Sequence, residues 1–429
     1  MKGGFVTVES RSERLRKQKH RRKSKGAAWK KLLGLTAAGV ACLSIGVFAA
    51  YLTTNSDKAG LEQAQEELVI PTATAAPKPK PAASAKPSAQ PESDQAAKPS
   101  PQATVKEPSA GASAGASGRV ELAFVGDVLL GSKVEDIMKK NGYDYPYSNV
   151  KALLSDPDYT IANLETPVTT RGEQQTKEYA YRSPPEAIPA LKASGIDLVN
   201  LANNHTLDFG VQGLTDTMDA LDKNGLAHVG AGMNKDEAYR PVIVEKMGIR
   251  IAFLGFSRVL PESWWKAGDS NPGLAETYNY VLPVEAVKQA RQQADLVVVI
   301  AHWGVERSDS PDASQTEMAH RYIDAGADLV VASHPHVLQG FEAYKGKWIA
   351  YSLGNFIFTT NDVPKTWETA VLQASCSKER DCDLTVVPVW TKSALPTPMN
   401  AEDGAKLFQR LSGISINAQV QQDGRVVGR

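Results

Sequence analysis

The stretch VVASHPHVLQG, residues 330–340, ends a run of aliphatic residues with two histidines on either side of one proline. Side chains alternate between faces along an extended strand, so His334 and His336 are predicted to point to the same side. Pro335 restricts the backbone between them. Because a buried strand has no structural need for two imidazole rings at its end, we expect both rings to reach one metal ion or two neighbouring ones.

The residues around this stretch predict an α/β fold. Between residues 119 and 360, aliphatic runs typical of strands alternate with segments typical of helices, several of which stop at glycine. Two segments, 241–257 and 341–355, are typical of β-hairpins. The order predicts a mixed sheet or two stacked sheets flanked by helices. Predicted strands cover residues 119–127, 158–165, 196–205, 295–304 and 328–336, and predicted helices cover 132–142, 184–195, 211–225, 283–294 and 313–327.

Each strong predicted strand is followed by a carboxylate, an amide or an imidazole. Ligands in α/β proteins bind beyond the carboxyl ends of strands. Four of the seven histidines occupy such positions, and packing alone does not explain that accumulation. The candidate residues are Asp127, Glu165, Asn203, Asn204, His205, His302, His334 and His336.

These side chains offer nitrogen and oxygen ligands but no thiolate. A mixed set of this kind favours zinc, manganese or iron over calcium, which prefers oxygen alone. After residue 118 the sequence contains no GxSxG nucleophile elbow, no Walker lysine motif and no GxGxxG. A divalent metal site is therefore the chemistry that the sequence favours.

The first 52 residues predict a membrane anchor. Residues 11–31 contain eleven Lys and Arg and one Glu, whereas residues 32–52 contain no charged residue. About 20 helical residues cross the hydrocarbon core of a bilayer, and positive charge keeps the adjoining flank in the cytoplasm. We therefore predict a cytoplasmic segment at 1–31, a single transmembrane helix at 32–52 and an extracytoplasmic remainder. A cleaved secretory signal is the alternative, and no nucleic-acid partner is needed to explain the basic run.

Residues 53–118 are predicted to be a disordered linker. From residue 71 to residue 118 there are nine prolines and no aromatic residue, so the segment buries too little apolar surface to fold. Residues 1–118 carry 18 Lys and Arg against 9 Asp and Glu, whereas the remainder carries 30 against 39. Because the external part is acidic, a polyanionic ligand would need a local basic groove or bridging metal ions.

Residues 361–429 are predicted to form a β-rich C-terminal extension with a short helix. A hairpin over residues 367–390 carries Cys376 and Cys382 on either side of its turn. A helix at 401–414 and a hairpin at 417–429 follow. An oxidising compartment would let the two cysteines form a disulfide, and two free thiols on a polar turn are the alternative.

Six motifs in fixed order resemble the CapA family of bacterial capsule-synthesis proteins, which includes PgsA-like proteins of poly-γ-glutamate production. They are FVGDVLLG, ANLETPVT, LANNHTLDFG, IAHWGVE, SHPHVLQG and YSLGNFIF, and they lie within residues 119–360. The basic leader, the anchor and the external domain are similar to that family's layout. The resemblance implies a role in the export, retention or processing of poly-γ-glutamate, an anionic polymer, with capsule-synthase membrane subunits as partners.

The family in turn resembles, more remotely, the calcineurin-like metallophosphoesterases, whose fold is a sandwich of two β-sheets flanked by helices. Leu129 stands where those enzymes place a histidine ligand, and Glu165 stands in place of their bridging aspartate. The resemblance therefore implies one or two divalent ions, either manganese, zinc or iron. The implied metal ligands are Asp127, Glu165, Asn204, His302, His334 and His336.

Three further residues are candidates for chemistry. His205 would pass a proton to a leaving group. Arg182 would bind an anion through its planar guanidinium, or is an ordinary surface arginine. Asp208 would support a ligand histidine, or caps a loop. The residues leave two alternatives to the capsule role open, namely an extracellular metal-dependent phosphoesterase acting on an envelope phosphoester and a metal-free scaffold with a decayed site.

Overall fold

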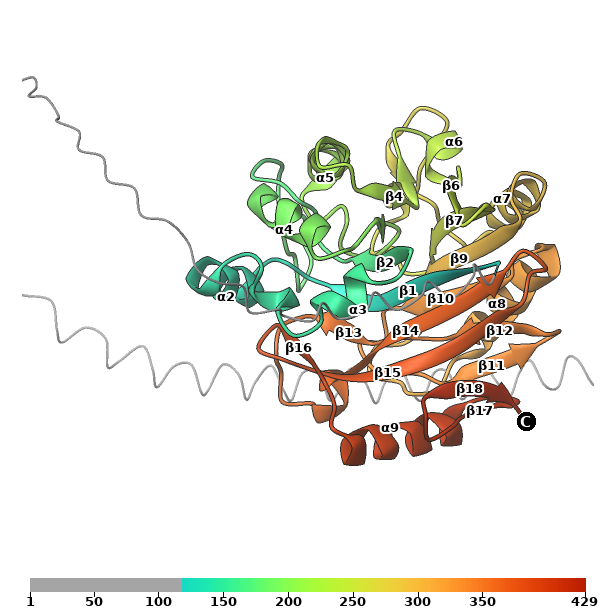
Figure 1. The fold of residues 1–429 in the computed structure, drawn as a ribbon. Coiled ribbons are helices and arrows are strands. Elements are labelled where there is room, and N and C mark those ends of the chain that lie inside the picture. The colour runs from blue at the N-terminus through green and yellow to red at the C-terminus, as the bar shows by residue number, and fades with distance from the viewer. Residues whose placement is uncertain (1–117) are drawn as a thin grey trace, which may run out of the picture. The chain divides into compact units, whose positions relative to one another are not determined.

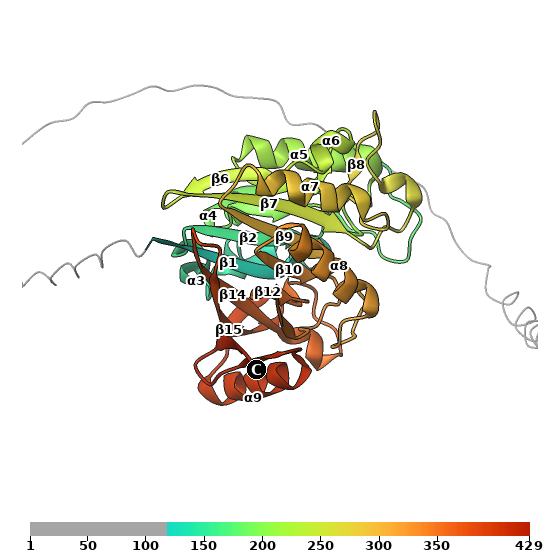
Figure 2. The same cartoon turned by 90° about the vertical axis from the view of Figure 1, so that its right-hand side faces the viewer.

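In this computed structural model, two β-sheets lie face to face and helices cover their outer surfaces (Figure 1, Figure 2). The structure describes residues 118–429. The predicted segment 1–31, the predicted transmembrane helix 32–52 and all but the last residue of the predicted linker 53–118 lie outside the described residues. Within residues 118–429, no helix is both long and apolar enough to cross a bilayer.

The larger sheet has ten strands, and β1 lies near its middle. β13 (Asn355–Ile357) also pairs with β1, and β16 (Leu395–Pro398) pairs with β15. In order across the sheet, the other strands are β17 (Ala418–Val420), β18 (Arg425–Gly428), β15 (Cys382–Lys392), β14 (Glu368–Ser377), β1 (Arg119–Val128), β2 (Tyr159–Leu164), β3 (Leu198–Asn200) and β4 (Ala227–Val229).

The second sheet has six strands, and β7, β9 and β10 run parallel at its centre. A separate pair joins β5 (Ala231–Gly232) to β8 (Gly273–Leu274). In order across the sheet, the six strands are β11 (Phe341–Tyr344), β12 (Lys347–Ala350), β10 (Leu329–Ser333), β9 (Leu296–His302), β7 (Ile249–Ser257) and β6 (Val242–Lys246).

Helices cover the outer face of each sheet. Residues of α2 (Lys133–Asn141), α3 (Lys151–Ser155), α4 (Ile188–Ala193) and α5 (Gly210–Lys223) pack on the ten-stranded sheet. Residues of α6 (Lys235–Ala238), α7 (Val281–Arg291) and α8 (Ala313–Ala325) pack on the six-stranded sheet. α9 (Ala401–Ile414) instead contributes to the cluster between the sheets, on the side where β17 and β18 lie (Figure 1). Single 3-10 turns occur at Tyr145–Tyr147, Pro185–Ala187, Ser263–Trp265 and Pro364–Trp367.

The alternation of side chains along β9 shows how these layers form. Leu296, Val298 and Ile300 belong to the cluster between the two sheets, whereas Val297 and Val299 belong to the cluster under α7 and α8. Because both faces of the strand are buried, its sequence is a continuous aliphatic run rather than an alternating one. The predicted α/β order of helix-flanked sheets is confirmed.

One prediction about a chain segment needs correction. The strand predicted over residues 196–205 is only three residues long, Leu198–Asn200. The segment 361–429 contains strands β14 to β18 and helix α9, and β14 pairs with β1 from Arg119 to Phe124 within the ten-stranded sheet. The predicted hairpins do form, as the pairing of β6 with β7, of β11 with β12, of β14 with β15 and of β17 with β18 shows.

Candidate metal centre

Four strand ends from the two sheets bring the predicted ligands together. β1 and β2 run parallel in one sheet, and β9 and β10 run parallel in the other. Asp127 lies next to the last residue of β1, and His302 is the last residue of β9. Glu165 follows the end of β2, and His334 follows the end of β10. All four side chains are buried.

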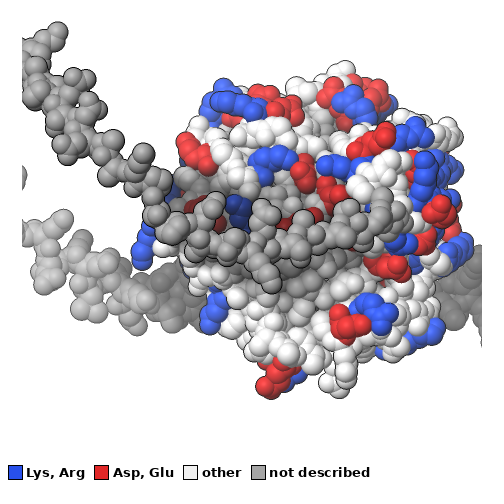
Figure 3. All heavy atoms as spheres, viewed as in Figure 1, with Lys and Arg blue, Asp and Glu red and all other residues white. Residues whose placement is uncertain are grey.

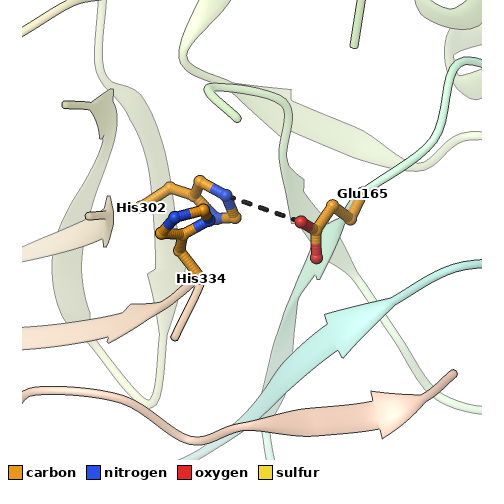
Figure 4. Close-up of side chains that lie close together, drawn as sticks. All are labelled: Glu165, His302 and His334. Atoms are coloured by element: carbon orange, nitrogen blue, oxygen red, sulfur yellow. Dashed lines mark ion pairs between the residues drawn. The ribbon is translucent and has the colours of Figure 1, made fainter. Parts of the chain in front are cut away.

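One cluster joins a carboxylate to two imidazole rings (Figure 4). Glu165, His302 and His334 each offer one ligand atom within 4.8 Å of the other two. Nε2 of His302 lies 3.6 Å from Oε1 of Glu165, and the two ring centroids lie 4.7 Å apart. Because two ligands about 2 Å from one ion are at most roughly 4 Å apart, this cluster is close to the size of a metal site.

A second cluster shares the same carboxylate. Asp127, Glu165 and His336 also offer ligand atoms within 4.8 Å of one another. Nδ1 of His336 lies 3.3 Å from Oδ2 of Asp127, and its Nε2 lies 3.9 Å from Oε1 of Glu165. Glu165 thus lies between the two clusters, at the position that an ion-bridging carboxylate would take.

Buried atoms without partners show that the residues fit a metal ion. Both carboxylate oxygens of Glu165 and Nδ1 of His334 are buried and have no hydrogen-bond partner among the described residues. Burying a carboxylate without a compensating partner is strongly unfavourable. A divalent cation would satisfy these atoms, and the mixed imidazole and carboxylate donors suit zinc, manganese or iron.

The two carboxylates have opposite pKa shifts. Burial and the adjacent charge of Asp127 raise the pKa of Glu165 well above its ordinary value. Burial alone would raise the pKa of Asp127 as well, but the hydrogen bond and the charge of His336 lower it below the ordinary range. Two carboxylates that share one site repel each other, so one of them holds a proton unless a cation neutralises both.

Three imidazoles at the centre also differ in pKa. Burial lowers the pKa of His334 to about 3, and burial lowers the pKa of His302 well below its ordinary value. Burial likewise opposes the charged form of His336, but its pKa is raised because it bonds to Asp127. His302 and His334 are therefore neutral at pH 7, as metal-binding imidazoles must be.

The backbone at the two opening histidines differs from the prediction. β10 ends at Ser333, and His334 and His336 have φ angles of 102° and 57°. Both residues therefore lie in the left-handed region and not in an extended strand, so the predicted alternation along a strand is wrong. A turn brings both rings to the centre instead. Residues other than glycine rarely adopt positive φ, and such strain is concentrated at functional sites.

Asn204 and His205 lie beside the clusters on the loop after β3. Oδ1 of Asn204 lies 2.8 Å from Nε2 of His302. Nδ1 of His205 lies 2.7 Å from Oδ2 of Asp208, and Nζ of Lys177 donates to Oδ1 of the same carboxylate at 2.7 Å. Asp208 is thus a partner of His205. Burial lowers the pKa of His205, whereas Asp208 raises it, and burial prevails.

Comparison with known proteins identifies the family. Residues 121–360 match the family model described as bacterial capsule synthesis protein PGA_cap. The chain belongs to this family of bacterial capsule synthesis proteins. The predicted resemblance to capsule-synthesis proteins of the CapA type is confirmed.

Two CapA proteins are similar over most of the chain. The PGA biosynthesis protein CapA of Bacillus subtilis (strain 168) is 34% identical over 309 residues, which are 71% of this chain and 80% of the relative. The capsule biosynthesis protein CapA of Bacillus anthracis is 33% identical over 301 residues, which are 68% and 73%. The crystal structure of TT1561 of Thermus thermophilus covers 62% of this chain and 99% of its own at 9% identity, but its TM-score of 0.35 is too low to establish a shared fold.

Buried amides for which the sequence motifs indicate no role also contact the candidate ligands. Asn163 donates to Oδ1 of Asp127 at 2.9 Å, and Asn200 donates to Oδ1 of Asn163 at 3.0 Å. Oδ1 of Asn355 lies 2.9 Å from Nδ1 of His336. This contact keeps the hydrogen on Nδ1 and leaves Nε2 free to bind a metal. Asn163 and Asn355 both belong to motifs quoted above, ANLETPVT and YSLGNFIF, and that was the available signal.

The other candidate residues lie beside the centre or away from it. Arg182 is exposed, and its guanidinium lies 4.7 Å from the ring centroid of Phe209. Leu129 is buried in the core under the outer helices and not at the centre. Cys376 and Cys382 are joined by a disulfide in the hairpin of β14 and β15. Lys177 was missed because nothing in its local sequence indicates that it contacts Asp208.

Proposed function

We propose that this protein is a membrane-anchored, extracytoplasmic component of capsule synthesis that handles poly-γ-glutamate in its export, retention or processing. Support comes from the family match over residues 121–360 and from relatives named PGA and capsule biosynthesis protein CapA. The predicted anchor at 32–52 and the predicted linker at 53–118 would hold the described domain outside the membrane. Other membrane subunits of a capsule synthase are its proposed partners.

The observation that carries the proposed chemistry is the buried carboxylate of Glu165, which belongs to both ligand clusters and has no hydrogen-bond partner within residues 118–429. The ion or ions would be held by Glu165 with His302 and His334 on one side, and with Asp127 and His336 on the other. Asn204, which contacts His302, would add an amide oxygen. A bound divalent ion lowers the pKa of water and polarises an acceptor oxygen.

The chain's own residues would then position a proton. Nδ1 of His205 faces the carboxylate of Asp208, so its hydrogen is held there and Nε2 remains to exchange a proton with a ligand. Lys177 fixes the same carboxylate from its other oxygen. Arg182, exposed and stacked on Phe209, is available to bind a carboxylate or phosphate group of the ligand.

Metal content tests this proposal. We expect the purified full-length protein to retain zinc, manganese or iron, as measured by inductively coupled plasma mass spectrometry. The His336→Ala variant should lose most of that metal, whereas the His320→Ala variant should not, because His320 contacts Glu342 on another part of the six-stranded sheet. Equal metal content in the two variants would contradict the assignment of the centre, and no metal in the wild-type protein would favour the metal-free scaffold.

A reporter fusion tests the proposed topology. A periplasmic or secreted reporter enzyme fused after Gly118 should be active outside the cell, and activity only in the cytoplasm would reject the orientation.

A second candidate function is an extracellular metal-dependent phosphoesterase acting on an envelope phosphoester. The observation that favours it is the His205 and Asp208 pair beside the two clusters, which is the arrangement of a proton donor next to a metal site. Hydrolysis of a generic phosphodiester that is lost in Asp127→Ala and in His205→Ala would support it. Loss of hydrolysis in His205→Ala with the metal retained would separate proton transfer from metal binding.

A further inference from the structure

Two buried glutamine side chains connect the start of α8 to the loop of residues 304–310, which follows β9. Oε1 of Gln315 accepts a hydrogen bond from the backbone N–H of Asp312 at 2.9 Å, and Nε2 of Gln315 donates to Oε1 of Gln339 at 2.8 Å. Nε2 of Gln339 donates in turn to the backbone carbonyl oxygens of Ser308 and Ser310, at 2.9 and 3.1 Å. Gln339 therefore holds the loop at two backbone positions.

The chemistry of these hydrogen bonds requires an amide at position 339. A backbone N–H only donates and a backbone carbonyl only accepts, so each glutamine between them must accept on one side and donate on the other. A carboxylate has no N–H to donate, and an apolar side chain neither donates nor accepts. Because a buried carbonyl oxygen without a donor is unfavourable, the loop depends on the N–H groups of Gln339.

The start of the loop also packs closely on the two glutamines. Gly304 has a φ of 93°, and a Cβ at this position would lie 2.6 Å from Oε1 of Gln315. Oγ of Ser308 donates to the carbonyl oxygen of Ser310 at 2.8 Å, so the stretch that Gln339 holds has an internal hydrogen bond as well. These contacts fix the position of the loop.

The loop in turn contacts the turn that carries two predicted metal ligands. The backbone N–H of Arg307 donates to the carbonyl oxygen of Pro335 at 2.7 Å. Pro335 lies between His334 and His336, whose φ angles are 102° and 57°, and Arg307 itself has a φ of 62°. Three residues with positive φ are thus gathered around one hydrogen bond. Because residues other than glycine rarely adopt positive φ, the surrounding contacts must maintain this arrangement.

The geometry points to Gln339 as a positioning residue of the candidate metal centre. Its amide holds the loop of residues 304–310 against the histidine turn, so that the N–H of Arg307 stays on Pro335 and the two imidazoles keep the orientation in which they bind an ion. Within residues 118–429, the side-chain amide of Gln339 bonds to none of the predicted ligands. The proposal rests on the proposed function for the metal, whereas the attachment of the loop needs no metal.

Two measurements on the purified full-length protein test this role. The first is zinc affinity, measured by competition with a chromophoric chelator, because a nitrogen and oxygen site binds zinc more tightly than manganese or iron. The second is hydrogen exchange of the loop 304–310 in metal-free protein. Gln339→Glu, which has no N–H for the loop, should bind zinc about tenfold more weakly and exchange the loop amides faster. Gln339→Met, which has a similar length and no charge, should change both in the same direction.

The matched control is Glu342→Gln on β11. Glu342 is also buried, and its carboxylate contacts His320 and accepts from the hydroxyl of Tyr351, neither of which belongs to the loop. This substitution should lower the free energy of unfolding but leave zinc affinity and loop exchange unchanged. It therefore separates loss of positioning from a general loss of stability.

The possible results decide between these roles. Unchanged zinc affinity in both Gln339 variants would overturn the positioning role, and so would an equal loss of affinity in Glu342→Gln, since the effect would then follow stability alone. Unchanged loop exchange in both Gln339 variants would show that the amide does not hold the loop. If the wild-type protein binds no zinc, the proposed function fails, whereas the exchange measurement still decides whether Gln339 holds the loop.

Discussion

His336 has a backbone conformation that an L-residue adopts only at a cost. Its φ of 57° lies in the left-handed region, where a residue with a Cβ is disfavoured by about 1–2 kcal/mol. The same turn places Nδ1 of His336 against Asn355 and Nε2 toward Glu165. The strain is therefore maintained by the contacts that orient the imidazole toward the centre.

Comparing a glycine variant with an alanine variant of His336 measures the backbone strain at this residue. Both His336→Gly and His336→Ala remove the ring, but only glycine adopts positive φ without cost. We expect the glycine variant to have the larger free energy of unfolding, by about 1 kcal/mol, in urea titrations of metal-free protein. His320, inside α8, is the control, and there alanine should be more stable by about 0.5–1 kcal/mol. The same order at both positions would show that residue 336 is not strained.

His228, at the end of the ten-stranded sheet, predicts a pH dependence outside the centre. Burial lowers its pKa, the nearby Asp222 raises it, Arg240 lowers it, and burial prevails. Since the folded pKa lies below the unfolded value of 6.5, the unfolded state binds the proton first as pH falls. The contribution of His228 to the unfolding free energy is fully present above the unfolded pKa. It is lost as the pH falls from that pKa toward the folded pKa.

Substitution isolates the contribution of His228. Between pH 7.5 and pH 5.5, the wild-type protein should lose more unfolding free energy than His228→Gln, which does not titrate. The measurement is urea unfolding followed by tryptophan fluorescence at both pH values. Parallel losses in the two proteins would reject a neutral, partly buried His228.

At the scale of elements, the sequence predicted most strands because their positions follow from local composition. Aliphatic runs such as that of β9 indicate a strand buried on both faces, and the rule that ligands gather at strand ends located the centre. The strand predicted at 196–205 failed at Asn200, whose side chain accepts from the backbone N–H of Ala202 and starts a turn. Such local side-chain hydrogen bonds compete with the backbone hydrogen bonds between strands. They cannot be predicted from the pattern of aliphatic residues.

The amides around the centre could not be predicted for a different reason. Asn163 and Asn355 act on Asp127 and His336, which are 36 and 19 residues away in the chain. No periodicity or spacing in one sequence indicates which distant side chain an asparagine contacts. Both asparagines lie in the quoted motifs, but the motifs do not indicate which side chains they contact.

The hairpin that carries the disulfide also joins the two sheets. Arg380, in its turn, donates to Oδ1 of Asp328 at 2.8 Å, and Arg291 and Lys347 reach the same carboxylate at 2.7 and 3.0 Å. Asp328 is fully buried at the start of β10. Three cations therefore depend on one carboxylate.

Because three cations share the carboxylate of Asp328, substitutions of Asp328 and of Arg380 should lower the free energy of unfolding by different amounts. Asp328→Asn leaves three cations without their shared anion and should lower the unfolding free energy by about 3 kcal/mol. Arg380→Ala leaves Asp328 with two partners and should cost about 1 kcal/mol or less. Asp324→Asn, at a surface pair with Lys345, is the control and should change little. Urea unfolding measures all three, and similar losses for Asp328→Asn and Asp324→Asn would contradict the role of the buried carboxylate.

At the scale of the molecule, the charges on the visible surface are mixed. On the face shown in Figure 3, Lys and Arg are interspersed with Asp and Glu over the described residues that can be seen. The sequence after residue 118 carries 30 Lys and Arg against 39 Asp and Glu. A long anionic polymer gains little from such a surface, so its binding would have to rely on local features such as Arg182 or on metal ions.

The ten-stranded sheet also makes the boundary at residue 360 a test of the whole fold. The family model ends there, but β14 pairs with β1, and Leu372, Leu384 and Phe408 belong to the core between the sheets. Without residues 361–429, β1 would expose an unpaired edge from Arg119 to Phe124, and the inner core would lose one side. An exposed apolar edge of this kind leads to aggregation.

Two deletions of different length therefore have opposite expected outcomes. A chain that ends at residue 360 should be insoluble or lack a cooperative unfolding transition, although it keeps every proposed metal ligand. A chain that begins at residue 118 should remain soluble and unfold cooperatively, because the three core clusters of the described domain are built from residues after that point. Solubility, circular dichroism and urea unfolding compare the two. A folded, cooperative protein ending at residue 360 would show that β14, β15 and α9 are additions to the domain and not part of its core.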